Sequence, residues 1–231
     1  PDAIILVDYP GFNLGIAKWV KKKLSAKVFY YISPKIWAWK EYRLKDIRKY
    51  VDCMLSILPF EVDYYKKHDY DVTYVGNPTV DELEPLRTEN FSREAFCLAH
   101  DLNLNQPIIA ILAGSRKAEV MGNLPIMLDA AIRFTCHQVV IAGAPGLSAD
   151  FYQPILDRFR AVPPVKIVFG ETYDLLRSAQ VAAVTSGTAT LETAFLNVPQ
   201  VVCYQFRGGK LAYKIMEFAL RRIRYVSLVN L

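Results

Sequence analysis

The sequence has no apolar run long enough to cross a bilayer, which takes roughly 18 to 20 uninterrupted apolar residues. Even the strongly apolar stretch Ala179–Phe195 is interrupted, by Thr185, Ser186, Gly187 and Glu192. We also expect no signal peptide, because the sequence opens with Pro-Asp-Ala and runs directly into an apolar strand. We therefore expect a protein that does not span a membrane.

Cysteine is scarce, and its spacing is uninformative for disulfides or metals. The sequence has 4 cysteines, without CxxC spacing and without the dense framework of a small secreted domain. They lie far apart in apolar surroundings, at Cys53, Cys97, Cys136 and Cys203. We expect reduced core residues in a cytoplasmic protein.

Histidine is scarcer still, and several common catalytic signatures are missing. The 3 histidines, His68, His100 and His137, share no metal-ligand spacing, so no bound metal is expected. The sequence contains no nucleophile elbow, no Walker loop and no GxGxxG fingerprint. These absences disfavour α/β-hydrolases, P-loop nucleotide hydrolases and dinucleotide-binding dehydrogenases.

Apolar residues make up 52% of the 231 residues and charged residues 22%, which is enough for a substantial buried core. The length fits one large domain or parts of two. The net charge of +5 is modest, but much of the excess lies in two segments, Lys35–Lys49 and Lys210–Arg224. A basic surface of this kind suits an anionic membrane, phosphate groups or nucleic acid.

Short apolar runs alternate with amphipathic stretches, which is typical of βαβ units and of a parallel sheet covered by helices. The first part of the chain is predicted to form strands at Ala3–Val7, Lys27–Tyr31, Cys53–Ile57 and Thr73–Tyr74. Helices are predicted there at Leu14–Leu24, Tyr42–Tyr50 and Phe60–Lys67. Later strands are predicted at Ile108–Leu112, Gln138–Ala142, Lys166–Phe169, Val181–Thr185, Val201–Tyr204 and Tyr225–Val226.

The fold class is therefore α/β, with two Rossmann-like, doubly wound parallel-sheet units facing a cleft. We expect the first unit at residues 1–80, a crossover at 81–106 and the second unit at 107–231. We expect both units to be truncated, because Ala3–Val7 reads as a fully buried strand and the chain stops abruptly at Leu231. Ligands of such sheets bind beyond the carboxyl ends of the strands.

The strongest motif runs from Val184 to Glu192 as a buried strand, a turn of small residues and the start of a helix. Backbone N–H groups at Gly187, with the hydroxyls of Ser186 and Thr188, can hold a diphosphate at such a turn. Glu192 can accept hydrogen bonds from ribose hydroxyls. The alternative is that Ser and Thr merely cap the helix, although Glu192 does not have the three-residue spacing of a capping box.

A second strand, Ala110–Leu112, runs into the polar loop Gly114-Ser115-Arg116, with Glu119 close behind. Arg116 stands where a guanidinium can form charge-assisted bonds to a phosphate, and Gly114 lets the backbone approach a ligand. The alternative is an ordinary strand-to-helix turn with an exposed arginine. A third loop, Gly143–Gly146, is interpreted as turn chemistry rather than as a set of ligand contacts.

Near the start of the chain, Asp8 follows directly after a predicted buried strand. A carboxylate in that position can act as a general base toward a sugar hydroxyl. On the residues alone, the alternative of a turn-capping aspartate is favoured.

The segment Tyr30–Arg43 is unusually aromatic and basic. Trp37 and Trp39, with Lys40 and Arg43, fit a surface that contacts lipid headgroups or an acyl-bearing substrate. Packing of the two tryptophans between helices is an equally good interpretation.

Taken together, these stretches resemble the lipid A disaccharide synthase family along nearly the whole chain. The matching segments are Asp8–Asn13, Tyr31–Pro34 with Trp37–Trp39, Leu58–Glu61, Val75–Pro78, Gly114–Arg116 with Glu119, Ser186–Glu192 and Tyr225–Asn230. The sequence departs from the family pattern at Asn77, Ala113 and Val229, where the family has histidine, proline and proline.

The resemblance implies an inverting GT-B glycosyltransferase that moves 2,3-diacylglucosamine from its UDP derivative to 2,3-diacylglucosamine 1-phosphate. The products are a β-1,6-linked disaccharide 1-phosphate and UDP. By this resemblance Asp8 is the catalytic aspartate and Arg116 an essential arginine. Ser186, Gly187, Thr188 and Glu192 belong to the nucleotide loop, and Asn230 lies near the nucleotide.

The resemblance also implies a peripheral enzyme at the cytoplasmic side of the inner membrane of Gram-negative bacteria. It implies no cofactor, because the UDP-sugar is a substrate, no metal and no nucleic-acid partner. Two alternatives stay open, namely another UDP-sugar GT-B enzyme, such as a MurG-like transferase or an epimerase relative, and a non-catalytic nucleotide- or membrane-binding fragment. Whether the protein forms a homodimer is also open.

Overall fold

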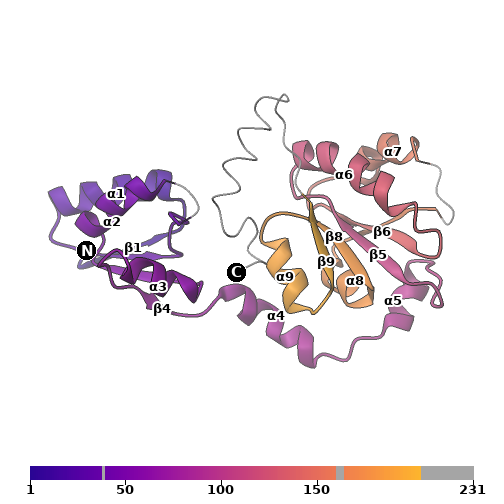
Figure 1. Cartoon of the computed structure of the whole chain (residues 1–231), viewed down its shortest axis with the longest axis horizontal. Helices are drawn as coiled ribbons and strands as arrows, with labels where there is room; N and C mark the ends of the chain where they lie inside the picture. Colours follow the sequence, from indigo (N-terminus) through magenta and orange to yellow (C-terminus); the bar gives the residue numbers. More distant parts are fainter. Residues whose placement is uncertain (38–39, 160–163, 204–231) are drawn as a thin grey trace. The chain divides into compact units, whose positions relative to one another are not determined.

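The structure, a computed structural model, describes residues 1–37, 40–159 and 164–203. The chain forms two compact units, Pro1–Glu82 and Leu83–Leu231. Each unit contains one parallel sheet with helices packed against it (Figure 1).

The first unit is built on a 4-stranded parallel sheet in the order β1-β2-β3-β4. The strands are β1 (Ala3–Val7), β2 (Lys27–Tyr31), β3 (Cys53–Ser56) and β4 (Thr73–Tyr74). Between them lie α1 (Pro10–Lys23), the 3-10 turn η1 (Glu41–Arg43) with α2 (Leu44–Tyr50), and α3 (Phe60–Lys66), and α4 (Pro78–Thr88) follows β4. Because the strands are in sequence order, right-handed crossovers place α1, α2 and α3 on one face of the sheet.

Burial alternates along the strands of this unit. Leu6 and Tyr30 point toward the helices and belong to the core, whereas Ile5 and Val7 on the opposite face are 68% and 52% exposed. The prediction that Ala3–Val7 is fully buried is therefore wrong. Within the described residues β1 pairs with β2 alone. A short apolar run does not indicate whether one face of the strand or both faces are covered.

The second unit contains a 5-stranded parallel sheet in the order β7-β6-β5-β8-β9. After α5 (Arg93–Ala99) the strands are β5 (Ile108–Leu112), β6 (Gln138–Gly143), β7 (Lys166–Phe169), β8 (Val181–Thr185) and β9 (Gln200–Cys203). The helices between them are α6 (Lys117–Ala131), α7 (Ala149–Leu156), α8 (Thr172–Ser178) and α9 (Ala189–Phe195).

The central strand β5 is buried along its whole length, because helices cover both faces of this sheet. One core cluster joins the sheet to α6 and α7, and another joins it to α5, α8 and α9. The chain leaves β5 toward β6 on one side and returns to β8 on the other. The strand order thus reverses between β5 and β8, which is where such sheets open a crevice for ligands.

Several boundaries differ by a few residues from those predicted. Helix α1 begins at Pro10 rather than Leu14, since a proline suits the first position of a helix. Strand β9 begins one residue early, at Gln200. The predicted strand Tyr225–Val226 and the basic segment Lys210–Arg224 lie outside the described residues. In the part of the chain that the structure describes, no helix has both the length and the apolar character needed to cross a bilayer.

The cysteines carry no disulfide, as expected. Cys97 is buried and Cys53 and Cys203 are half-buried, but Cys136 is exposed. The expectation of a core position is wrong for Cys136, because it lies in the polar turn between α6 and β6 rather than inside either element.

Candidate functional site

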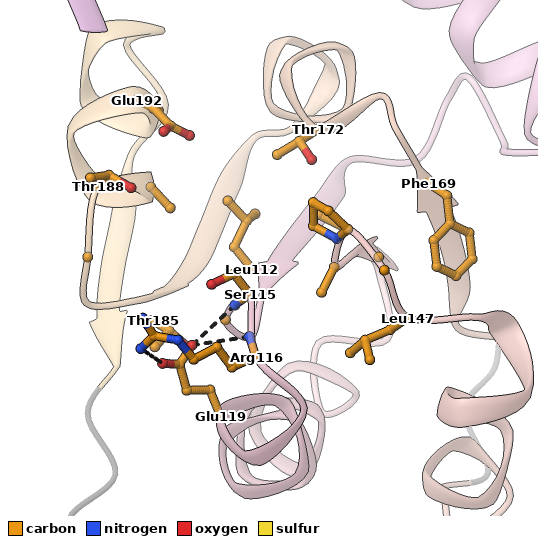
Figure 2. A pocket seen from close by; sticks show the side chains of 18 of the residues that line it. Leu112, Ser115, Arg116, Glu119, Leu147, Phe169, Thr172, Thr185, Thr188 and Glu192 are labelled. Atoms are coloured by element: carbon orange, nitrogen blue, oxygen red, sulfur yellow. Dashed lines mark hydrogen bonds and ion pairs between the residues drawn. The ribbon is translucent and has the colours of Figure 1, made fainter. Parts of the chain in front are cut away.

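The second unit has a cavity of about 760 Å³ at the carboxyl ends of its strands. This volume lies in the usual range for small-molecule sites, which is roughly 300 to 1,000 Å³. The lining comes from the loops after β5, β6, β7 and β8 and from the first turns of α6, α8 and α9 (Figure 2). The cavity therefore spans the point where the strand order reverses.

The loop between β5 and α6 is held by the side chain of Glu119. Its Oε2 atom accepts the backbone N–H groups of Ser115 and Arg116, at 3.2 and 3.4 Å. Its Oε1 atom lies 3.1 Å from the Arg116 guanidinium. Gly114 has φ +120°, and a Cβ there would lie 2.7 Å from the Cβ of Glu119, so the tight loop requires glycine.

All four sequence candidates of this loop line the cavity, namely Gly114, Ser115, Arg116 and Glu119. Arg116 is not simply exposed toward a ligand, however, because it is paired with Glu119. Sequence reasoning did not predict this pair. The spacing of three residues between Arg116 and Glu119 was the signal that could have indicated this ion pair, because residues three apart on a helical turn are neighbours.

Asn123 joins the β5 loop to the β8 loop, and the sequence reasoning missed it. Its Nδ2 atom donates to the carbonyl of Ala113 at 3.2 Å and to Oγ1 of Thr185 at 3.0 Å. The side chain is buried on α6 between Val120 and Leu124. A lone amide among the apolar positions of an amphipathic helix was the signal that could have revealed it.

The loop after β6 forms part of the cavity wall. Residues Gly143, Ala144, Pro145 and Gly146 all line it, so the interpretation of these residues as turn chemistry alone is incomplete. Gly146, at φ +80°, does fit turn chemistry. At Gly143 a Cβ would lie 2.3 Å from the ring of Phe169. A glycine is therefore needed here, because the aromatic ring packs directly against the backbone.

The loop after β8 carries Ser186, Gly187 and Thr188, and all three line the cavity. Thr188 immediately precedes α9, but its side chain makes no capping hydrogen bond. The Thr190 hydroxyl instead donates to the carbonyl of Gly187 at 2.7 Å and closes the turn. The capping alternative therefore does not account for Thr188. Glu192 lies on the same wall, in the first turn of α9.

The cavity has a polar side and an apolar side. Figure 2 shows Arg116, Glu119, Thr185, Thr188 and Glu192 on one side, and Leu147 and Phe169 on the other. This arrangement offers a guanidinium to an anion, carboxylates to hydroxyl groups and an aromatic face to a flat ring. Among the described residues no cluster of three or more His, Cys, Asp or Glu side chains is placed to bind a metal ion.

The first unit presents a second group of candidates around Asp8, which is exposed at the end of β1. Asp8 and Tyr9 both adopt left-handed backbone conformations, with φ 44° and 45°. The carbonyl of Asp8 accepts the buried Tyr30 hydroxyl at 2.6 Å and the Asn13 amide at 2.7 Å. The turn that carries Asp8 is thus defined by side chains from β2 and α1.

Trp37 has the contacts that the packing interpretation predicts. Its Nε1–H donates to Glu61 at 3.0 Å, and its ring meets Phe60 edge-on at a centroid distance of 5.0 Å. Glu61 is 1% exposed and also lies 2.5 Å from the Ser56 hydroxyl. Burial raises the pKa of Glu61 above its ordinary value, although Ser56, Trp37 and Lys35 act in the opposite direction.

The other membrane candidates occupy different environments. Lys40 is exposed before η1, and Arg43 is half-buried, with Nη2 4.0 Å from the place where a Cβ on Gly11 would stand. Arg43 therefore lies beside the turn that carries Asp8. Trp39 and Asn230 lie outside the described residues.

Comparison with known proteins shows which family has sequences similar to this chain. Residues 1–231 match the model of a family described as lipid-A-disaccharide synthetase. The chain is 39% identical over 236 residues to the lipid-A-disaccharide synthase of Syntrophus aciditrophicus and 36% identical over 235 residues to that of Coxiella burnetii. In both cases the alignment covers 100% of this chain and 59% of the relative, so the chain spans about three fifths of the length of these relatives.

Solved structures with a similar fold have little sequence identity to the chain. The UDP-GlcNAc 2-epimerase of Neisseria meningitidis, solved with UDP-GlcNAc bound, has a TM-score of 0.57 at 15% identity. The match covers 89% of this chain and 60% of the epimerase. The UDP-N-acetylglucosamine 2-epimerase of Rickettsia bellii has a TM-score of 0.56 at 14% identity, with coverages of 95% and 65%. At this identity the similarity concerns the fold alone, an α/β fold with two parallel sheets.

Proposed function

We propose, from the premise that the chain belongs to the lipid-A-disaccharide synthetase family, that the cavity of its second unit binds the UDP part of a UDP-sugar. One observation carries this proposal: the family's Gly114–Arg116 and Ser186–Glu192 segments line one cavity at the strand ends, although their first residues are 72 positions apart in the sequence. A diphosphate, a ribose and a flat base need a cation, hydroxyl acceptors and an apolar wall, and this lining supplies all of them.

The roles of the lining residues follow from their chemistry. Arg116 and the hydroxyls of Ser115, Ser186 and Thr188 bind the diphosphate, and Glu192 accepts hydrogen bonds from the ribose. To bind the diphosphate, the Arg116 guanidinium exchanges its contact with Glu119 for one with a phosphate oxygen. Phe169 and Leu147 form the apolar side against which a uracil ring can lie.

We further propose that the full-length protein transfers 2,3-diacylglucosamine from this donor to 2,3-diacylglucosamine 1-phosphate with inversion. Asp8 removes the proton from the acceptor hydroxyl, and the resulting oxygen forms a bond to the anomeric carbon. The bond from that carbon to the diphosphate breaks on the opposite face, and UDP leaves with the electron pair. No metal or organic cofactor enters this proposal, because the UDP-sugar is itself the substrate.

The transfer assay uses the full-length protein with labelled acceptor and UDP-diacylglucosamine, and the products are separated by thin-layer chromatography. Turnover of the Asp8→Asn variant should fall by about 10² to 10⁴, the usual range for loss of a general base. Asn keeps the shape of Asp, so UDP affinity should stay the same. UDP-N-acetylglucosamine without acceptor is the control, because an epimerase would convert it to its C2 epimer. Formation of that epimer with no disaccharide product would contradict the proposed transfer.

A further inference from the structure

The turn that carries Asp8 is strained. Asp8 has φ 44°, and Tyr9 follows with φ 45° and ψ 59°. Two consecutive left-handed residues without a glycine are rare, because each places its Cβ close to the backbone. Such strain persists only where the surroundings hold it, and it gathers at functional sites.

Two side chains hold this turn by its carbonyl oxygens. The Tyr30 hydroxyl donates to the carbonyl of Asp8 at 2.6 Å. Asn13 donates from Nδ2 to the same oxygen at 2.7 Å and to the carbonyl of Val7 at 2.9 Å. The backbone N–H of Asp8 is bonded to the carbonyl of Tyr31 at 2.9 Å, so β2 fixes the residue from both ends.

Tyr30 is suited to this task by its position. It is fully buried, and it pairs with Leu6 in the register of β1 and β2, two residues before Asp8. Burial raises the pKa of its hydroxyl well above the usual value, the negative charge of Asp8 raises it further, and Arg43 acts in the opposite direction. The hydroxyl therefore stays protonated and remains a donor at every pH at which the protein would be assayed.

We propose that Tyr30 and Asn13 are positioning residues that hold the Asp8 carboxylate in the direction needed for proton removal. This inference rests on the proposed function, in which Asp8 is the general base. Without the two donors, the Asp8–Tyr9 turn relaxes to ordinary negative φ values, and the carboxylate moves with the backbone. A displacement of about 1 Å at a reacting group can cost about 10² in rate.

The test removes the hydroxyl alone. In the full-length protein, Tyr30→Phe should lower turnover by about 10- to 100-fold while the dissociation constant for UDP is unchanged. Tyr70→Phe is the matched control, because the Tyr70 hydroxyl also donates to a backbone carbonyl, that of Val51, at 3.2 Å in the same unit. It should keep normal turnover, and the two variants should lose similar amounts in melting temperature.

A double-mutant cycle separates positioning from a general loss of structure. If Tyr30 acts through Asp8, Tyr30→Phe should lower turnover in the natural background and have no further effect in the Asp8→Asn background. The same fold-loss in both backgrounds would overturn the inference, because it would show a merely structural effect. If Tyr30→Phe keeps normal turnover while Asp8→Asn loses it, the inference about Tyr30 would also be overturned. The assignment of Asp8 as the general base would then still stand.

Asn13→Ala provides a second variant, to be used in the same cycle if Tyr30→Phe does not fold. It removes the other donor from a half-buried position at the surface. It should reproduce the loss of turnover and the dependence on Asp8. Normal turnover of Asp8→Asn itself would instead contradict the proposed base, and with it the role of both positioning residues.

Discussion

Glu192 lies on the α9 wall of the cavity. The proposed ribose-binding position depends on its carboxylate. If the ribose hydroxyls donate to it, Glu192→Ala leaves them without a partner in a desolvated site, and UDP binding should weaken by about 1 to 3 kcal/mol. Calorimetric titration with UDP measures this loss. Glu94→Ala is the matched control, because Glu94 is an exposed glutamate in the first turn of another seven-residue helix, α5. Unchanged affinity of Glu192→Ala would remove Glu192 from the ribose site.

The sequence was informative about residues that follow directly after a strand. Ser115, Arg116 and Ser186 stand at strand ends, and parallel strands deliver their carboxyl ends to one edge, so their joint position could be predicted. Asn123 and Tyr30 could not be found this way. Their roles depend on partners far away in the sequence, such as Thr185 for Asn123 and Asp8 for Tyr30.

At the scale of elements, Glu61 ties the loop around Trp37 to β3 and α3. Its two carboxyl oxygens contact the Trp37 Nε1–H and the Ser56 hydroxyl. Ser56 also lies 3.0 Å from the carbonyl of Leu58. A neutral Glu61 can donate a hydrogen bond to the Ser56 hydroxyl oxygen, and the Ser56 hydroxyl then donates to the carbonyl of Leu58. An ionised Glu61 accepts a hydrogen bond from the Ser56 hydroxyl and is a buried charge, and its burial is the main cost.

This contact predicts a particular dependence of stability on pH. Because burial raises the folded-state pKa of Glu61, its contribution is complete at low pH and is lost as the pH rises from about 4.5 through the raised pKa. Each tenfold change in the acid dissociation constant corresponds to about 1.4 kcal/mol. Glu61→Gln keeps a neutral group in place, so the natural protein should lose melting temperature relative to this variant as the pH rises.

Glu94→Gln is the control, because it makes the same substitution at an exposed glutamate. The difference in melting temperature between this variant and the natural protein should not change with pH in the same way. Melting temperatures measured from pH 4.5 upward give both differences. A natural protein that gains stability relative to Glu61→Gln as the pH rises would mean that Ser56 and Trp37 keep Glu61 ionised in spite of its burial.

Secondary structure was largely predictable from the sequence, because short apolar runs between amphipathic stretches have few other interpretations. The error at Ala3–Val7 has a physical reason. The local sequence pattern shows only that the side chains are apolar. Whether one face of the strand or both faces are buried depends on which strands and helices lie next to it. The predicted start of α1 at Leu14 is four residues late, because the helical spacing of apolar residues indicates a start at Leu14, whereas the proline that opens the helix stands at position 10.

At the scale of the whole molecule, we propose that the protein associates with anionic membranes through the basic surface of η1 and α2. Leu44, Ile47 and Tyr50 of α2 are buried, which leaves Lys45, Arg48 and Lys49 exposed on its outer side. Because Trp37 is held by Glu61 and Phe60, its ring is not the main anchor of this surface. The attraction is therefore electrostatic, and vesicle binding should fall as the salt concentration rises.

Charge reversal tests where the membrane binds. Each basic residue near an anionic surface contributes about 1 kcal/mol, so Lys45→Glu with Lys49→Glu should weaken binding to phosphatidylglycerol-containing vesicles by at least roughly tenfold at low salt. Lys66→Glu with Lys67→Glu is the matched control, because these two lysines are exposed at the end of α3 in the same unit. Cosedimentation at two salt concentrations measures both variants. Equal weakening by the two pairs would show that net charge, rather than the α2 surface, drives binding, and no binding of the natural protein at low salt would contradict the proposed association.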